Sequence, residues 1–254
     1  MIKDVLIKIK RTMIKIYIAR HEQTFKHLKY IFQNNGSKTL IVAFSGFPGK
    51  GRKALYNYMA TLSGIKVNKL FLLDDIWNPV NVGSYYLGKD GDWYLIEEIT
   101  ALIDTIRKEN GITQVITVGS SKGGTSALFY GIKTEADACI IGTPQYHVGK
   151  YLSSATLSPI MDVIMGDHSQ ESIARLDEYI VQEIKRPHKK KPEVYIHYSP
   201  EEHTYKDHIV DMIADLRREG YKVMEDNDYK YEHHSDVAKY YPNYLVKTVK
   251  QIVK

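Results

Sequence analysis

Short continuous apolar runs alternate with stretches of helical spacing along this 254-residue chain. A continuous apolar run predicts a strand buried on both faces, and apolar residues three or four positions apart predict an amphipathic helix. The runs predict strands at residues 39–44, 67–73, 115–118, 138–142, 193–198 and 221–224. The helical spacing predicts helices at residues 97–110, 207–219 and 240–253, and another that follows residue 124. This alternation predicts an α/β fold with a mostly parallel sheet and helices on both of its faces.

Two parts of the chain depart from the alternation. Apolar residues and lysines alternate in residues 5–10 and again in 13–18, with a two-residue link between the runs. This pattern predicts an N-terminal antiparallel hairpin at the edge of the sheet. Residues 151–186 have helical spacing and no strong strand pattern, which predicts a helical cap insertion over the carboxyl edge of the sheet. No repeat or low-complexity linker divides the chain, so we expect one domain spanning residues 1–254.

Composition narrows the class of protein. A content of 43% hydrophobic and 26% charged residues is typical of a soluble globular protein. The single Cys139 excludes an internal disulfide and favours a reducing compartment. Lysines interrupt the apolar N-terminus, so we expect a cytoplasmic protein with neither a signal peptide nor a transmembrane segment. We interpret the basic run at residues 185–191 as a solvated loop, and since no nucleic-acid-binding signature accompanies it we expect no nucleic-acid partner.

The strongest chemical signal is the segment from Gly119 to Gly123, a G-x-S-x-G pattern between a predicted strand and a predicted helix. In this context the pattern indicates a nucleophile elbow, a tight turn that holds the Ser121 hydroxyl above the edge of the sheet. Glycine suits both outer positions because a side chain there would collide across the turn or block the approach of helix to strand. An ordinary glycine-rich turn between a strand and a helix has the same pattern, so residues elsewhere must separate the two.

A serine nucleophile needs a general base, because its hydroxyl is almost fully protonated at neutral pH. The segment between the last predicted strand and the last predicted helix contains His233 and His234. We prefer His234, because Ser235 and Asp236 directly after it are typical of a helix start and leave the histidine in a loop that can reach the elbow. His233 is the close alternative.

The histidine needs an acid that fixes its tautomer and stabilises the imidazolium. The loop after residue 198 supplies Glu201 and Glu202, of which we slightly prefer Glu202. Asp207 is a weaker candidate, because an acid at the predicted start of a helix is explained by capping. The chain order serine, acid, histidine is that of the α/β-hydrolases, so the expected fold is α/β-hydrolase-like.

Acyl transfer also requires backbone N–H groups that bind the developing oxyanion. One would be the N–H of Lys122, directly after the nucleophile, and the other the N–H of Phe47 in the loop that follows residue 44. Gly46 allows close approach of this loop and Pro48 stiffens it. For the Lys122 side chain two roles stay open, which are contact with an anionic or hydroxyl-rich substrate and capping of local carbonyls.

Two other kinds of site fit the sequence less well. The order S-S-K-G-G-T at residues 120–125 does not match the phosphate-binding pattern G-x-x-x-x-G-K-[ST], because the lysine precedes the glycine pair. His233, His234 and Asp236 could suggest a metal site, but adjacent histidines do not readily share one ion and no second ligand pair is spaced to help. We therefore expect no metal and no cofactor.

Three segments carry a family resemblance. They are GSYYLGKDGDWY (residues 83–94), VGSSKGGTSALFYG (118–131) and GTPQYHVGKYL (142–152). The chain resembles two related bacterial groups on these segments. One is the α/β-hydrolase-like accessory secretion protein that works beside the glycosylation and export of serine-rich-repeat adhesins. The other is a capsular-polysaccharide biosynthesis group with the same SKGG elbow.

The resemblance implies a triad of Ser121, Glu202 and His234 that supports acyl transfer onto carbohydrate, and partners among glycosylation or secretion accessory proteins. We therefore expect a serine-dependent esterase or O-acyltransferase that acts on a glycan or glycoconjugate through an acyl-Ser121 intermediate. Hydrolysis and transfer share this intermediate, so the sequence does not separate them. The alternative is a non-catalytic accessory protein that uses the hydrolase scaffold to bind a glycan or a partner in polysaccharide biosynthesis or glycoprotein export.

Overall fold

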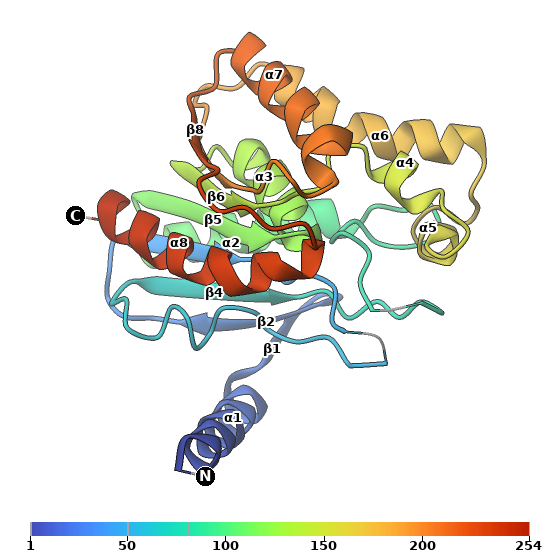
Figure 1. The fold of residues 1–254 in the computed structure, drawn as a ribbon. Coiled ribbons are helices and arrows are strands. Elements are labelled where there is room, and N and C mark those ends of the chain that lie inside the picture. The colour runs from blue at the N-terminus through green and yellow to red at the C-terminus, as the bar shows by residue number, and fades with distance from the viewer. Residues whose placement is uncertain (1, 50, 81, 254) are drawn as a thin grey trace.

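The computed structural model describes the chain except residues 1, 50, 81 and 254 and the side chains of residues 2–11. One eight-stranded sheet forms its centre, in the order β1-β2-β4-β3-β5-β6-β7-β8 (Figure 1). The strands are β1 (Gln23–Phe25), β2 (Leu28–Gln33), β3 (Thr39–Ala43), β4 (Asn68–Leu73), β5 (Gln114–Ser120), β6 (Ala138–Gly142), β7 (Glu193–His197) and β8 (Val223–Asp226). The helices are α1 (Ile2–His21), α2 (Leu95–Glu109), α3 (Lys122–Lys133), α4 (Val148–Leu152), α5 (Ser158–Met165), α6 (Gln170–Lys185), α7 (Val210–Arg218) and α8 (Val237–Ile252), with a π-helical turn η1 (Tyr205–Ile209) and a 3₁₀ turn η2 (His234–Asp236).

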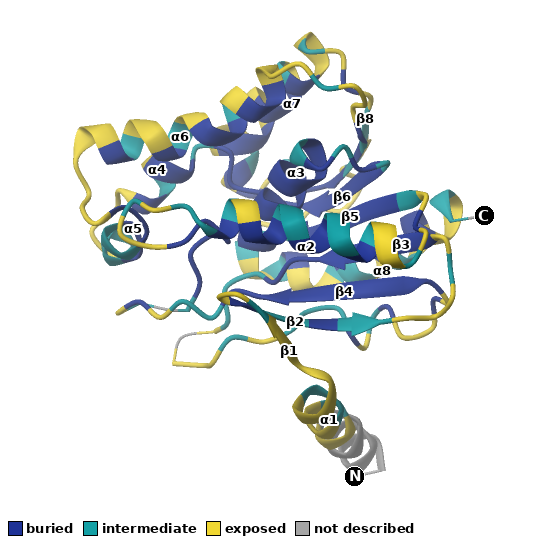
Figure 2. Cartoon of the chain, turned by 180° about the vertical axis from the view of Figure 1, so that it is seen from behind, coloured by how far each residue is buried: buried dark blue, intermediate teal, exposed yellow. Residues whose placement is uncertain are grey.

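The predicted α/β architecture is confirmed. Strands β4, β3, β5, β6, β7 and β8 are parallel, and β1 and β2 add an antiparallel pair at one edge. Along β3 the side chains alternate between two cores, with Leu40 and Val42 in one and Ile41 and Ala43 in the other. The first core is closed by α2, α3, α6 and α7 and the second by α8, so helices cover both faces (Figures 1 and 2).

The antiparallel hairpin predicted at the edge of the sheet is confirmed, but it lies later in the chain than the predicted residues 5–18. Residues 5–18 lie within helix α1, and the antiparallel edge pair is formed instead by β1 and β2. Ile14, Tyr17 and Ile18 pack against the second core, and their spacing of three and four residues suits a helix rather than a strand. The turn of the true hairpin is at Lys26, which adopts a φ of 52°. A two-residue hairpin link needs such a positive φ, which the β-branched Thr12 of the predicted link disfavours.

The helical insertion between β6 and β7 consists of α4, α5 and α6 and is confirmed. It lies beyond the carboxyl ends of the strands, with α6 packed on α3 and α4 (Figure 1). Gly149 of α4 lies so close to α6 that a Cβ there would overlap the carbonyl of Ile173. Helix α3 is covered on all sides and almost wholly buried (Figure 2).

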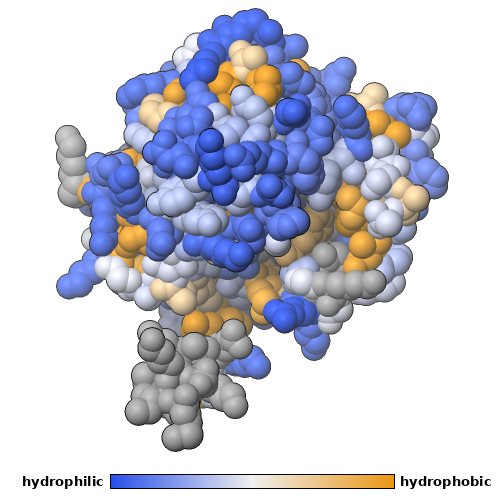
Figure 3. All heavy atoms as spheres, viewed as in Figure 1, coloured by the Kyte–Doolittle hydropathy of each residue, from blue (hydrophilic) through white to orange (hydrophobic). Residues whose placement is uncertain are grey.

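The surface seen from the side of α8 is mostly hydrophilic, and its apolar residues form separate patches (Figure 3). Within the described residues, no helix has the length and apolar character that crossing a bilayer requires.

Candidate active site

Ser121 lies on a sharp turn between β5 and α3. Its backbone has a φ of 53° and a ψ of −132°, a conformation that is strained for a residue with a side chain. Its N–H donates to the Gly142 carbonyl at 2.8 Å, which ties the turn to β6. A Cβ at Gly119 would overlap the Gly123 carbonyl, and one at Gly123 would lie 2.5 Å from the Phe44 carbonyl. Both glycines therefore provide the close backbone approach that a nucleophile elbow needs.

The structure brings Ser121, His234 and Glu202 into one hydrogen-bonded chain. His234 Nε2 lies 2.8 Å from Ser121 Oγ, and His234 Nδ1 lies 3.1 Å from Glu202 Oε1. If Nδ1 carries the proton and donates it to the carboxylate, Nε2 is free to accept the serine proton. The His234 side chain is 26% exposed and that of Glu202 is fully buried, so the histidine lies at the boundary with solvent.

Glu202 follows β7, and the fold holds it in the ionised form. Its carboxylate accepts hydrogen bonds from the backbone N–H and the hydroxyl of Thr204. Burial by itself raises the pKa of Glu202, but the hydrogen bonds from His234 and Thr204 outweigh burial and leave the pKa below its ordinary value. A carboxylate that stays ionised is able to stabilise an imidazolium at His234.

The other candidates for base and acid lie apart from this chain. His233 is exposed at the start of η2. Glu201 is exposed, and its carboxylate lies 3.9 Å from the Lys230 ammonium. Asp207 is also exposed and lies 3.3 Å from His203. The geometry therefore separates Glu202 from Glu201, which the sequence could not do.

The two segments expected to supply oxyanion donors lie side by side. A Cβ at Gly46 would be 3.4 Å from the carbonyl of Ser120, so the loop after β3 packs against the elbow. Lys122 is the first residue of α3, where a backbone N–H has no partner within the helix. The Phe47 ring lies 5.3 Å from the Lys122 ammonium. This arrangement makes the Phe47 and Lys122 N–H groups candidates for an oxyanion site.

The Lys122 side chain takes neither of the two roles left open by the sequence. It is fully buried and its ammonium lies 2.7 Å from a carboxylate oxygen of Asp74, which follows β4. Burial lowers the pKa of Lys122, and the attraction of Asp74 acts in the opposite direction. Asp74 also accepts hydrogen bonds from the backbone N–H groups of Ser84 and Tyr86. The ion pair therefore fixes the GSYYLG segment to the elbow.

Gln145 is a residue of the site that sequence reasoning missed. It is buried, and its side-chain Nε2 donates to Ser121 Oγ at 3.3 Å. Its Oε1 accepts from the Tyr85 hydroxyl at 3.3 Å, and its backbone N–H and carbonyl both bond to the Thr125 hydroxyl at 2.9 Å. The sequence signal that could have identified Gln145 was its place in the loop after β6, because the carboxyl ends of neighbouring parallel strands meet at one edge of the sheet.

No cluster of three or more possible metal ligands occurs among the residues that the structure describes.

In the basic run at residues 185–191, Lys190 pairs with Asp137 at 2.6 Å and Arg186 with Glu183 at 3.4 Å. Neighbouring acids thus offset part of its charge.

The sheet order, the elbow after β5 and the helical insertion define an α/β-hydrolase fold. No protein-family model and no curated protein sequence matches the chain. Among solved structures, the capsule O-acetyltransferase of Neisseria meningitidis serogroup A is 19% identical, with a TM-score of 0.76 over 90% of this chain and 93% of that one. A mutant of that enzyme was solved in complex with CoA.

Two further structures have the same fold. The glycosylation-associated Gap123 complex of Streptococcus agalactiae is 18% identical, with a TM-score of 0.71 over 90% of this chain and 46% of that chain. The fluorophosphonate-binding serine hydrolase FphF of Staphylococcus aureus is 14% identical, with a TM-score of 0.58 over 89% and 92%. The structural neighbours thus include the two kinds of protein that the sequence resembles. At these identities the likeness is one of fold.

Proposed function

We propose that this protein is a serine-dependent acyl-transfer enzyme that forms an acyl-Ser121 intermediate and passes the acyl group to a hydroxyl of a glycan or glycoconjugate. The observation that supports it is the hydrogen-bonded chain from Ser121 through His234 to Glu202 at the carboxyl edge of the sheet. This edge is where α/β folds bind their ligands. The strained backbone of Ser121 is a second support, because strain of this kind accompanies nucleophile elbows.

In the first half-reaction, Ser121 Oγ attacks the acyl carbonyl carbon and His234 Nε2 takes the hydroxyl proton. The tetrahedral intermediate then breaks its bond to the leaving group, which receives the proton from His234. In the second half-reaction, His234 takes the proton of the acceptor hydroxyl, whose oxygen attacks the acyl ester, and Ser121 Oγ leaves with that proton. The N–H groups of Phe47 and Lys122 stabilise the oxyanion, and ionised Glu202 stabilises the imidazolium.

For the substrates we infer a CoA thioester as donor and a polysaccharide hydroxyl as acceptor. The capsule O-acetyltransferase and its CoA complex support this choice over simple ester hydrolysis. A water molecule in place of the sugar hydroxyl turns the same intermediate into hydrolysis. A CoA donor also suits a cytoplasmic location, where the buried Cys139 remains a thiol.

A fluorophosphonate probe tests the nucleophile directly, because it phosphonylates only an activated serine. We expect the wild-type protein to be labelled at Ser121 and the Ser121→Ala variant to stay unlabelled. Ser120→Ala is the matched control, since its hydroxyl bonds to Tyr58 at 2.7 Å rather than to His234. If the folded wild type is not labelled, or if Ser121→Ala is labelled equally, the proposal is wrong.

The Gap123 neighbour favours a second candidate, a non-catalytic accessory protein in glycosylation. Folded protein that resists the probe, yet binds a glycan or is retained by glycosylation proteins, would support this candidate instead.

A further inference from the structure

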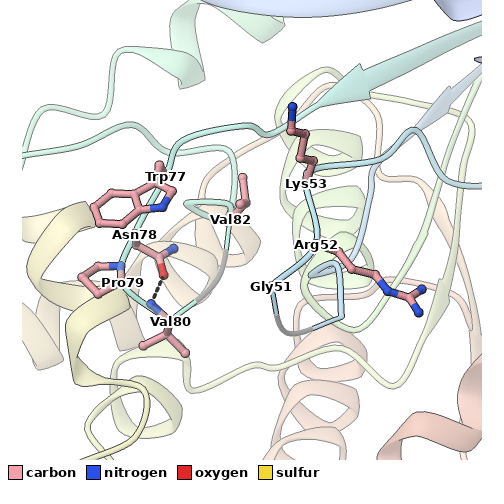
Figure 4. Close-up of a pocket in the computed structure, with 8 residues that line it drawn as sticks. All are labelled: Gly51, Arg52, Lys53, Trp77, Asn78, Pro79, Val80 and Val82. Carbon is pink, nitrogen blue, oxygen red and sulfur yellow. Dashed lines mark hydrogen bonds between the residues drawn. The ribbon is translucent and has the colours of Figure 1, made fainter.

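A pocket of about 380 Å³ opens between the loops that follow β3 and β4. Residues 51–53 form one wall, and residues 77–80 with Val82 form the other (Figure 4). A volume of this order accommodates one small-molecule group rather than a run of polymer. Neither wall contributes a residue to the Ser121–His234–Glu202 chain, so the pocket is separate from the nucleophile.

One wall presents an aromatic side chain to solvent. Trp77 is 70% exposed, and hydrogen bonds link described residues on either side of its turn. Asn78 Nδ2 donates to the Gly83 carbonyl at 3.1 Å, Asn78 Oδ1 accepts from the Val80 N–H at 3.1 Å, and the Gly83 N–H donates to the Ile76 carbonyl at 2.7 Å. An exposed indole is suited to stacking against a planar ligand.

The facing wall carries positive charge. Arg52 and Lys53 are both exposed, and within the described part of the chain neither side chain is paired with a carboxylate. In Figure 4 the Trp77 ring, the Arg52 guanidinium and the Lys53 ammonium point in three different directions, so both cations must turn about their side-chain torsions to meet a ligand stacked on Trp77. Arginine and lysine without a partner bind phosphate groups. The pocket therefore combines a surface for a planar ring with cations for phosphate.

Both loops of the pocket also contact the residue next to the nucleophile. Phe47, in the same loop as Arg52, places its ring 5.3 Å from the Lys122 ammonium. Gly83, which closes the turn of Trp77, lies against the same ammonium, since a Cβ there would be 2.9 Å from it. The two loops that line the pocket therefore also contact Lys122, the residue that follows Ser121.

We infer that this pocket binds the phosphorylated nucleoside end of the acyl donor, with the base stacked on Trp77 and the phosphates facing Arg52 and Lys53. The inference rests on the proposed function, because it assigns a site to the donor of that reaction. It also gives Trp77 a role in donor recognition rather than in catalysis.

Binding of adenosine 3′,5′-bisphosphate and of CoA to the Ser121→Ala protein, measured by calorimetry, tests the pocket without any turnover. We expect Trp77→Ala and the double variant Arg52→Ala/Lys53→Ala each to weaken binding about tenfold or more, as for loss of a stacking or phosphate contact. The matched control is Lys66→Ala/Lys108→Ala, which removes two exposed charges near the opposite, amino-terminal edge of the sheet. Trp77→Phe keeps an aromatic face and should retain most of the affinity.

Three results would overturn the inference. They are no binding of either nucleotide, equal loss of binding in the control variant, and tighter binding of a sugar phosphate than of the nucleotide. Probe labelling of Ser121 in the wild type distinguishes failure of this inference from failure of the proposed function. Labelled Ser121 without nucleotide binding removes the pocket assignment alone, whereas nucleotide binding without labelling leaves the pocket and removes the acyl-enzyme.

Discussion

The Lys122 ammonium lies 2.7 Å from the Asp74 carboxylate, and both side chains are fully buried next to the turn of Ser121. The lysine also lies 4.4 Å from the centre of the Tyr86 ring. Asp74 holds the backbone of the GSYYLG segment, in which Tyr85 and Tyr86 adopt positive φ angles of 55° and 58°. Because an unpaired charge in this place is costly, the pair ties the elbow and this strained segment to each other.

Lys122→Met should lower the free energy of unfolding by about 3–5 kcal/mol, since it leaves the Asp74 charge buried without a partner. Urea unfolding followed by circular dichroism measures the loss. The double variant Lys122→Met/Asp74→Asn removes both charges and should lose less than the sum of the two single variants. Additive losses would show that the two groups do not interact.

Replacement of His234 by Ala should reduce kcat/KM by about 10³-fold or more, because the serine then has no general base. His233→Ala is the matched control, since this neighbouring side chain is exposed and lies outside the hydrogen-bonded chain. Hydrolysis of an activated acyl ester gives the rate for both variants. A larger loss in His233→Ala than in His234→Ala would show that His233, rather than His234, is the general base.

The free energy of unfolding should include a contribution from ionised Glu202 that is lost in acid. The pKa of Glu202 in the folded protein lies below its ordinary value of 4.5, so the unfolded chain takes up the proton first. Ionised Glu202 therefore stabilises the fold above that value, and the contribution is lost as the pH falls through the lower, folded pKa. The difference in free energy of unfolding between wild type and Glu202→Gln should shrink over this range. A difference that is independent of pH would contradict the lowered pKa.

Gln145→Ala should lower the rate of Ser121 labelling by about tenfold, the effect of losing one hydrogen bond of roughly 1.4 kcal/mol at the reacting oxygen. We regard Gln145 as a positioning residue that orients Ser121 Oγ. Tyr85→Phe should have a smaller effect in the same direction, because it frees the amide of Gln145 without removing it. If both variants are labelled at the wild-type rate and with the wild-type pH profile, Gln145 has a purely structural role.

Gly119→Ala should prevent folding or destabilise the protein by more than about 4 kcal/mol, because the added Cβ overlaps the Gly123 carbonyl in rigid backbone. Gly64→Ala is the matched control, as nothing lies within 4 Å of a Cβ there. Thermal unfolding of both variants provides the comparison. A stable Gly119→Ala protein would mean that the elbow can widen.

Some of the architecture could be predicted because local patterns record it directly. The all-apolar runs at residues 39–44 and 138–142 have the hydrophobicity of strands buried on both faces, and β3 and β6 occur there. The alternation at residues 5–18 was ambiguous, because apolar residues at such spacing can also form one side of a helix. In the structure the segment is helical, and Ile14 and Tyr17 pack against the second core.

The sequence by itself determined the alternating strands and helices, the place of Ser121 on a glycine-bounded turn and the order of the candidate acid and base behind it. Short-range patterns and chain order are sufficient for these features. The tertiary structure decided which histidine bonds to Ser121, which glutamate bonds to that histidine, that Gln145 also contacts Ser121, and that Lys122 faces inward to Asp74. These contacts join residues 24 to 113 positions apart, and they depend on the pairing of parallel strands and the depth of burial. No local pattern encodes such distances.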